Sequence, residues 1–583
     1  MHNLYMICYA KFMIEYVADN IVVLAERKLT YYVYAVGNTV IRWNGGLSRD
    51  NRGMGYGYRH QNVNSAITIL SSSASHTDTA TADESFSIIE ATVDDIKLAF
   101  TQNKVTSRQL VQSYIDRINS LNRTLKGVIE VNPDALSLAD NADRERRDNE
   151  PVSLSRLHGI PVLVRDIFDT KDKMSTTAGS FALPQGSVVP CDAGVVTKLR
   201  NAGGIILGKA SLSEWSGFRG YRQPTGWSAR GDYGVNPYDS NLTPCGSSSG
   251  SAISAAASFA TVTIGAETDG SILCPSSLNS VVGIKPTVGL TSRAGVIPIS
   301  PRQDSVGPIC RTVSDAVYVL DTIAGLDNND TATVPMPKYI PSGGYAQFLK
   351  RDGVKGKRLG IVRNPFFNFS SADVRNAFEA HFNKLRQEGA TVIDNLQITN
   401  VNEILSDANT ELTALTAEFK ISLNSYLSNL MNSPVRTLAD AIDFNNKNPD
   451  LEKINQYGQE LFERSQATNG IGTKEREAID KLARQTREGF VKLMETNNLD
   501  AVVAGPGGSN FPESQFPRIL AIGGLPGITV PAGYTNQNKT PLGIFFGGLN
   551  GTEPKLIEIA YAFEQATKAR IPPTITSLKY QTY

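Results

Sequence analysis

The sequence predicts an α/β fold in which helices cover both faces of a central mixed β-sheet. From residue 86 onward, short apolar runs rich in β-branched residues alternate with helical stretches. The 583 residues are 41% hydrophobic and 20% charged, a balance typical of a globular protein with a large core. An apolar run at 253–264, between two Gly/Ser-rich turns, reads as a helix followed by a buried strand.

The first half of this region is expected to begin with helices. Thr106 and Gln109 form a capping box that opens one of them, and Val105 and Leu110 are placed as its hydrophobic staple. The periodicity predicts further elements in order: helices at 93–100, 106–120, 133–148 and 192–201, a short helix ending at 215, and strands at 127–131, 160–164 and 204–207.

The second half continues the alternation and then becomes mostly helical over 402–497, with breaks near Pro434 and at 445–449. Strands return afterwards, and an amphipathic helix closes the chain. The expected elements are helices at 312–324, 372–388 and 555–568, and strands at 358–362, 391–393, 501–504, 527–531 and 542–546.

Three regions are expected along the chain. Residues 1–85 have no clear periodicity and are predicted to form a poorly ordered N-terminal extension. Residues 86–577 form the main domain, and the helical segment 402–497 is an insert that lies near the functional site and shapes substrate choice.

Charge and composition exclude several classes of function. Lys plus Arg equals Asp plus Glu, at 57 each, and no basic run with interleaved aromatics occurs, which argues against nucleic-acid binding. The sequence contains no run of 18 apolar residues, which argues against a transmembrane helix. Five cysteines without CxxC spacing argue against a zinc site or a disulfide framework. Cys245 and Cys274 flank the candidate site and could meet, but buried free thiols are the expected state.

The stretch 239–285 carries the chemistry. It is rich in small and hydroxylated residues, and its two serine-bearing turns, 246–250 and 269–271, are tied to opposite ends of one buried unit. Glycine lets backbone N–H groups crowd a bound group, and serine supplies hydroxyls that attack or relay protons. This arrangement favours a nucleophile on one turn and a helper on the other.

Several blocks in the same order carry a resemblance to a known family. CGSSSGSA at Cys245 and GAETDGSI at Gly265 are joined by five further blocks: GIPVLV at Gly159, ILGKASLSEW at Ile206, DSVGPICRTVSDA at Asp304, LPGITVPAG at Leu525 and YAFEQATKARIPP at Tyr561. Over roughly residues 86–573 the chain resembles the amidase signature family, most closely its peptide amidase branch. The resemblance implies that family's α/β fold and a serine hydrolase that uses a Ser–cis-Ser–Lys arrangement.

By position, the resemblance implies roles for individual residues. Ser271 matches the nucleophile, Ser247 the bridging serine after a cis peptide bond from Gly246, and the loop Thr268, Asp269, Gly270 and Ser271 the oxyanion hole. The implied substrate is a C-terminal peptide amide or a small amide, cleaved without a metal or cofactor. No oligomeric state follows from the sequence.

One position departs from the family pattern. Where the family has GIPVLVKD, this chain has GIPVLVRD, so Arg165 stands in place of the lysine that accepts the serine proton. The pKa of a lysine side chain is ~10.4 in water, and burial can lower it by ~3–5 units. The pKa of arginine lies above ~12. Deprotonating arginine at pH 7 therefore costs at least roughly 7 kcal/mol. Activity is expected to be impaired, unless Lys171 or Lys173 supplies the base.

Three alternatives remain beside the serine amidase. The chain could be an inactive relative that binds an amide-like ligand or partner. The segment 246–250 also fits the G-x-S-x-G nucleophile elbow of an α/β-hydrolase-type esterase, with Ser248 attacking and His381 as the one downstream histidine. The segment 203–209 approaches a phosphate-binding loop, but Ala210 lacks the Mg²⁺-binding hydroxyl, so Lys209 is interpreted as structural.

Overall fold

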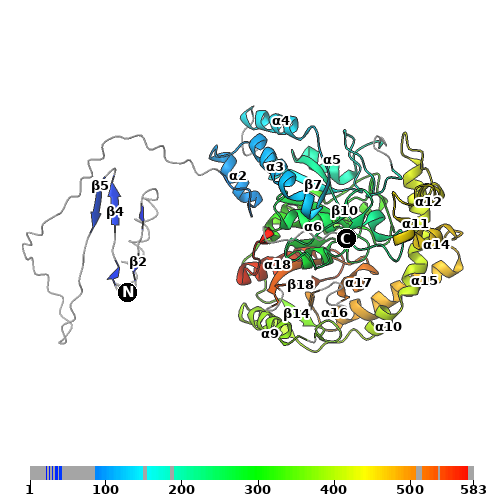
Figure 1. Ribbon diagram of the computed structural model, residues 1–583. Coiled ribbons are helices and arrows are strands. Elements are labelled where there is room, and N and C mark those ends of the chain that lie inside the picture. Colours follow the sequence, from blue (N-terminus) through cyan, green and yellow to red (C-terminus); the bar gives the residue numbers. More distant parts are fainter. Residues whose placement is uncertain are drawn as a thin grey trace, which may run out of the picture. The chain divides into compact units, whose positions relative to one another are not determined.

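A computed structural model describes residues 86–148, 154–183, 189–369, 371–506, 515–535 and 539–575, together with short strands between residues 21 and 42 (Figure 1). By its contacts the chain divides into two units, Met1–Glu84 and Ser85–Tyr583. Each unit is described by itself below.

The first unit contains short antiparallel strands. β4 (Val33–Val36) pairs with β1 (Ile21–Val22) and β5 (Thr39–Arg42), and β2 (Ala25–Glu26) pairs with β3 (Leu29–Thr30). Strands of two to four residues are too short to leave a readable alternation, which is why the sequence did not indicate them. The other residues of the predicted extension at 1–85 lie outside the described part of the chain.

The described part of the second unit is built on a mixed, 11-stranded sheet, as predicted. Its strands lie in the order β15-β14-β16-β18-β17-β12-β13-β11-β7-β8-β6. Two groups of neighbours are parallel, β11-β7-β8 and β15-β14-β16, and the other neighbouring pairs are antiparallel. The bounds are β6 Val128–Val131, β7 Pro161–Arg165, β8 Ile205–Ala210, β11 Val262–Glu267, β12 Val282–Lys285, β13 Ser305–Cys310, β14 Arg358–Ile361, β15 Thr391–Ile393, β16 Ala501–Ala504, β17 Gly527–Tyr534 and β18 Pro541–Gly547.

Helices connect these strands. The predicted capping box at Thr106 is confirmed, because its side chain accepts the N–H of Gln109 while Gln109 returns a bond to the Thr106 backbone. That helix continues five residues beyond the predicted end, since its apolar stripe extends to Leu125. The bounds are α2 Val93–Thr101, α3 Ser107–Leu125, α4 Ala135–Asp148, α5 Gly194–Asn201, α6 Ser249–Ala256, α7 Leu273–Leu278, α8 Val313–Ile323, α9 Ala372–Gln387, α17 Phe516–Ala521 and α18 Glu553–Thr567.

The segment predicted to be a helical insert is helical throughout most of its length. In Figure 1 helices α11, α12, α14 and α15 form a group at one side of the second unit. The bounds are α10 Val401–Ser406, α11 Ala408–Ser428, α12 Leu438–Lys447, α13 Ile454–Tyr457, α14 Glu460–Gln466, α15 Thr473–Thr486, η6 Arg487–Val491 and α16 Lys492–Thr496. The short elements elsewhere are η2 Glu214–Gly217, η3 Thr331–Thr333, η4 Pro337–Tyr339, η5 Ala346–Phe348, and the paired strands β9 Trp227–Ser228 and β10 Asp232–Tyr233.

Strand β13 shows how helices cover both faces of the sheet. Ile309 packs into a small apolar cluster with alanines of α6 and with Ile272 and Val281, which flank α7, whereas Val306 and Cys310 belong to the main core, which contains residues of α8. Because successive strand side chains point to opposite faces, the two clusters lie on opposite sides. The sheet is therefore the middle layer.

Three strands differ from the sequence prediction. β8 continues through Lys209 and Ala210, beyond the predicted end at residue 207, because these residues pair with Val164 and Arg165 of β7. β12 and β13 were not predicted, since their glycines obscure the β-pattern. Gly307 allows the two to approach closely: a Cβ there would lie 1.9 Å from the carbonyl oxygen of Ile284.

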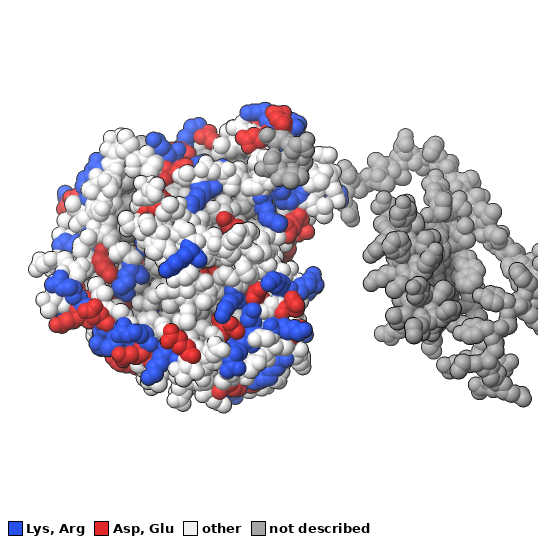
Figure 2. Space-filling model, turned by 180° about the vertical axis from the view of Figure 1, so that it is seen from behind, with Lys and Arg blue, Asp and Glu red and all other residues white. Residues whose placement is uncertain are grey.

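Surface charge on the second unit is mixed. On the face in Figure 2, basic and acidic side chains are interspersed and do not gather into a region of one sign. Among the described residues, no helix has the length and apolar character needed to cross a bilayer.

Candidate active site

The predicted site residues lie at one edge of the sheet. Arg165 is the last residue of β7, Ser216 follows β8, and Ser271 follows β11. Because these three strands are parallel neighbours, their carboxyl ends meet, which is the edge where α/β sheets hold ligands. Ser247 reaches this edge from the turn before α6.

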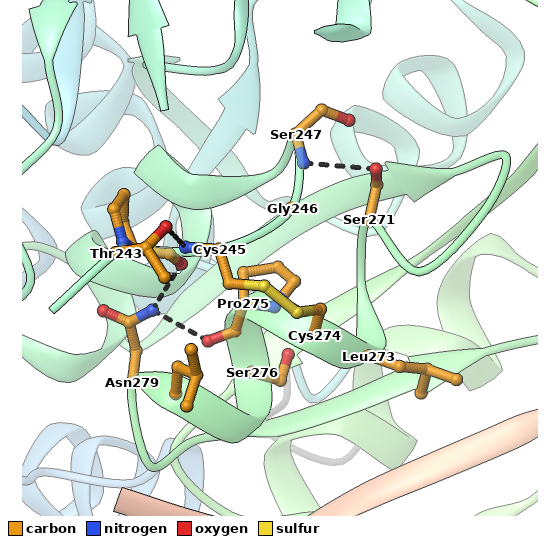
Figure 3. Close-up of a disulfide and its surroundings, with 12 residues drawn as sticks. Thr243, Cys245, Gly246, Ser247, Ser271, Leu273, Cys274, Pro275, Ser276 and Asn279 are labelled. Carbon is orange, nitrogen blue, oxygen red and sulfur yellow. Dashed lines mark hydrogen bonds between the residues drawn. A yellow bond between two sulfur atoms is a disulfide. The ribbon is translucent and has the colours of Figure 1, made fainter. Parts of the chain in front are cut away.

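The two serine turns are in direct contact. The backbone N–H of Ser247 donates to the Ser271 Oγ at 3.1 Å, and the backbone N–H of Ser248 donates to the Ser271 carbonyl oxygen at 3.2 Å. Figure 3 shows the first of these bonds, with the Ser247 turn lying over the chain that carries Ser271. The structure therefore brings together the two hydroxyl residues that the sequence singled out, through a backbone donor.

Gly246 sets the shape of the Ser247 turn. Its φ is +56°, and a Cβ there would lie 2.5 Å from Pro275 Cδ and 3.2 Å from Ser271 Cα. Only glycine fits this conformation and this contact. The expected cis bond between Gly246 and Ser247 is wrong: the cis peptide bond in the described residues is Asn364–Pro365, and the left-handed glycine instead turns the Ser247 N–H toward Ser271.

The loop before Ser271 is held by two hydrogen bonds between Thr268 and the segment before β13. The Thr268 hydroxyl donates to Asp304 Oδ1 at 2.6 Å, and the Gln303 amide donates to the Thr268 carbonyl oxygen at 3.2 Å. Gly270 has φ +75°, which glycine adopts without strain. The sequence did not indicate Gln303 or Asp304 as site residues, although both lie in the DSVGPIC block or directly before it.

Glu267 supports the chain that follows Ser271. This buried carboxylate accepts the N–H groups of Ile272 at 2.7 Å and Leu273 at 2.9 Å. Burial raises the pKa of Glu267, while Lys285 opposes that rise. Burial lowers the pKa of Lys285 to about 8, and its ammonium donates to the Leu525 carbonyl at 2.7 Å, so Lys285 has a structural role.

Both terminal nitrogens of Arg165 donate to groups around the site. Its Nη1 donates to Ser248 Oγ at 3.2 Å and to the Ala266 carbonyl at 2.9 Å, and its Nη2 donates to Ser216 Oγ at 2.6 Å. The guanidinium therefore contacts Ser248 and not Ser247. Ser248 Oγ also bonds to the backbone of Ala266, whose carbonyl oxygen accepts from Arg165, so the three groups form one cluster. Burial lowers the pKa of Arg165 to about 9, against the opposing charges of Asp304 and Asp166. Arg165 is still cationic at pH 7, although the difference between its pKa and pH 7 is smaller than the sequence implied.

Ser216 stands in an unusual backbone conformation. It and Trp215 both have left-handed φ angles, +60° and +49°. Non-glycine residues adopt this region at a cost, and such residues concentrate at functional sites where the surroundings hold them. Ser216 lines the cavity described below and links it to Arg165, yet the sequence carried no signal for it.

The nucleophile-elbow alternative is wrong. The Ser248 hydroxyl is completely buried and is used by Arg165 and by the backbone of Ala266. His381 lies on α9, where its ring bonds to the Ala532 carbonyl at 2.8 Å. Neither group can form the Ser–His pair that the elbow requires.

The lysines considered as substitute bases lie elsewhere. Lys171 is exposed, and Lys173 is exposed and pairs with Asp134 at 2.7 Å. Neither lines the cavity that holds Ser271. Lys209 is buried and donates to the Phe168 carbonyl at 2.7 Å and to Thr176 Oγ1 at 3.0 Å, which is the structural role predicted for it.

Ser271 opens onto a cavity of about 480 Å³. Besides the two serine turns, its lining includes Asp269, Ser216 and Arg518. Arg518 pairs with buried Glu411 of α11 at 2.9 Å, so helix α11 supports the wall of the site. Burial raises the pKa of Asp269, and the negative charge of the nearby Glu411 raises it further. A larger cavity of about 720 Å³ lies around Asp327 and Tyr426 and contains none of the predicted site residues.

Cys245 and Cys274 form a disulfide, so the expectation of free thiols is wrong for this pair. Their Cα atoms lie 5.7 Å apart, within the usual range for such bonds. Both cysteines line the Ser271 cavity, and Figure 3 shows the bond beside the two serine turns. The odd cysteine count hid the pairing, whereas the position of both residues next to the site was the available signal.

Comparison with known proteins places this arrangement in a family. The amidase family model matches residues 109–515. A protein of Arabidopsis thaliana named "probable amidase" is 55% identical over 491 residues, which cover 84% of this chain and 92% of that protein. The crystal structure of the native peptide amidase from Stenotrophomonas maltophilia is 43% identical, with a TM-score of 0.78, and covers 84% of this chain and 99% of that one.

A second structure of a peptide amidase, in complex with the competitive inhibitor chymostatin, is 42% identical, with a TM-score of 0.76, and covers 83% of this chain and 99% of that one. The fold and the family together define an amide-hydrolysing enzyme. The chain belongs to the amidase signature family.

Proposed function

We propose that this chain is a serine amidase that hydrolyses a carboxamide, either a C-terminal peptide amide or a small amide, through an acyl-enzyme on Ser271. The observation that carries the proposal is the Ser271 hydroxyl, which opens onto the cavity and accepts the Ser247 N–H at 3.1 Å. The similarity to peptide amidases over nearly their whole length supports the substrate class.

In the proposed reaction Ser271 Oγ bonds to the amide carbon and gives up its proton. The oxyanion accepts N–H donors from the loop formed by Thr268, Asp269, Gly270 and Ser271. The C–N bond then breaks and the amine or ammonia leaves with a proton. Water attacks the ester, which releases the acid and restores the Ser271 hydroxyl.

Arg165 holds the Ser248 turn and adds positive charge beside the oxyanion loop. It stays protonated at pH 7 because the pKa of Arg165, although lowered to about 9 by burial, remains above neutrality. Only the small neutral fraction of Arg165 can accept the serine proton at pH 7, so turnover at pH 7 is slower than a more readily deprotonated lysine at position 165 would allow.

The second candidate is a relative that binds an amide-like ligand without cleaving it. The cationic guanidinium at the position of the family lysine favours this reading. A fluorophosphonate probe, which reacts with an activated serine, separates the two. We expect labelling of Ser271 in the wild type, none in Ser271→Ala, and release of ammonia from a panel of peptide amides. No labelling in the wild type together with labelling in Arg165→Lys would support the non-catalytic candidate.

A further inference from the structure

The Cys245–Cys274 disulfide joins the two turns that carry the candidate reaction. Cys245 comes two residues before Ser247, and Cys274 comes three residues after Ser271. Between them lies the bond from the Ser247 N–H to Ser271 Oγ, the contact that aligns the two turns. Figure 3 shows the disulfide and this hydrogen bond close together in the same region.

The turn at Cys245 is also held by a hydrogen bond from a distant residue, because Asn279 donates to the Pro244 carbonyl oxygen at 2.9 Å. Cys245 has a left-handed φ of +54°, which a non-glycine residue adopts only when it is held. Its N–H donates to Thr243 Oγ1 at 3.1 Å, a contact within the same turn. The next residue, Gly246, lies against the ring of Pro275, which follows Cys274. The covalent link therefore holds a strained turn against the start of α7.

The disulfide is open to small reagents. Cys274 is half-buried, and both cysteines line the cavity that also holds Ser271. A reagent that enters this cavity meets both cysteines of the disulfide. Cys191 and Cys310 are the free cysteines of the described residues, and neither lines this cavity.

We propose that the Cys245–Cys274 disulfide positions Ser271 for attack and that its reduction by a small dithiol lowers amide hydrolysis without unfolding the enzyme. The inference depends on the proposed role of Ser271 as nucleophile. In the redox step a thiolate of the dithiol attacks one sulfur and forms a mixed disulfide. Its second thiol then displaces the remaining protein thiol. The dithiol loses two electrons and two protons and becomes a cyclic disulfide, and the protein gains two thiols.

The test uses the full chain and dithiothreitol. The thiol count before and after treatment, with peptide mapping by mass spectrometry, establishes how much of the 245–274 bond is reduced. We expect kcat to fall by about 10- to 100-fold, the order that a displacement of a reacting group by about 1 Å costs, with KM little changed. Circular dichroism in the near-UV remains that of the folded protein, and activity returns after the dithiol is removed and the bond reforms.

Matched variants complete the test. Cys245→Ser/Cys274→Ser should have the low kcat of the reduced enzyme and no response to dithiothreitol, whereas Cys191→Ser should respond as the wild type does. If the double variant does not fold, the reversible reduction of the wild type still tests whether the disulfide positions Ser271. Full reduction with unchanged kcat would overturn the inference. Failure of the proposed function is seen separately, as absence of fluorophosphonate labelling of Ser271 in the oxidised enzyme.

Discussion

Arg165 Nη1 donates to Ser248 Oγ at 3.2 Å, so the guanidinium at the family's lysine position contacts the serine beside Ser247 and not Ser247 itself. The same nitrogen donates to the Ala266 carbonyl, and Ser248 Oγ donates to that carbonyl as well. Arg165 therefore fixes the backbone at the end of β11, four residues before Ser271. Its contacts indicate a group that holds the site together at neutral pH.

Replacing Arg165 by lysine is expected to raise kcat/KM at pH 7 by about tenfold. The buried Lys285 has a pKa lowered to about 8, and a lysine at position 165 would experience similar burial. Moving a base from a pKa of about 9 to one of about 8 raises its neutral fraction at pH 7 about tenfold. Arg165→Met, which fills similar volume without a titratable group, is the control. Equal kcat/KM in the lysine and methionine variants would contradict this role.

In the wild type, kcat/KM should continue to increase as the pH is raised above 7. Burial lowers the pKa of Arg165 to about 9, and a base acts in its neutral form, which becomes populated only as the pH rises through the pKa. We therefore expect kcat/KM to increase between pH 7 and pH 9 without a plateau at pH 8. In Arg165→Lys the rising limb should move to lower pH. A wild-type profile that is flat above pH 7 would show that another group accepts the proton.

Substitution of Arg518 by alanine should destabilise the protein and weaken substrate binding. Arg518 pairs with Glu411 at 2.9 Å, and both side chains are largely buried. Removing one partner of a buried pair leaves an uncompensated charge, which costs about 3 kcal/mol of unfolding free energy. Urea unfolding of Arg518→Ala, Glu411→Gln and the double variant measures the coupling. The double variant should recover part of the loss, and additive losses would contradict the pair.

In the same Arg518→Ala variant, KM should rise more than kcat falls, because Arg518 lines the cavity but makes no contact with Ser271 among the described bonds. Steady-state kinetics on one peptide amide give both constants. A fall in kcat at constant KM would place the effect on the reacting atoms instead.

Gly246→Ala should impair catalysis more than an equally strained glycine elsewhere. The new Cβ would meet the rigid ring of Pro275 at 2.5 Å and push the Ser247 turn away from Ser271. Gly356 is the control, since it also has a positive φ, +77°, but a Cβ added there would meet no heavy atom within 4 Å. Left-handed alanine costs about 1–2 kcal/mol in either place. Only Gly246→Ala should also lower kcat, which turnover and urea unfolding measure together.

Much of the fold was predictable because its elements have strong local signals. The capping box at Thr106 and the β-branched strands near Val162 and Val502 follow directly from residue type. The strands around Gly283 and Gly307 were not predictable, because glycine breaks the apolar pattern there: Gly283 leaves room for Ser276 of α7, and Gly307 for the backbone of Ile284 in β12.

For the site, the family blocks singled out Ser247, Ser271 and the loop at Thr268, which lie at one cavity edge or beside it. The sequence could not predict which side chains from distant segments contact these residues. Ser216 meets Arg165 across 51 positions, and Arg518 meets Glu411 across more than a hundred. Such contacts depend on the assembled tertiary structure and leave no local pattern.

The parallel alignment of β7 and β11 has a consequence for how activity arises during folding. Val162 pairs with Val262, so the ends of these strands meet only after a hundred intervening residues have been arranged. A fragment of residues 239–285 would contain both serine turns but would lack Arg165, which donates to Ser248 Oγ from β7. The complete proposed site therefore requires β7 to be paired with β11.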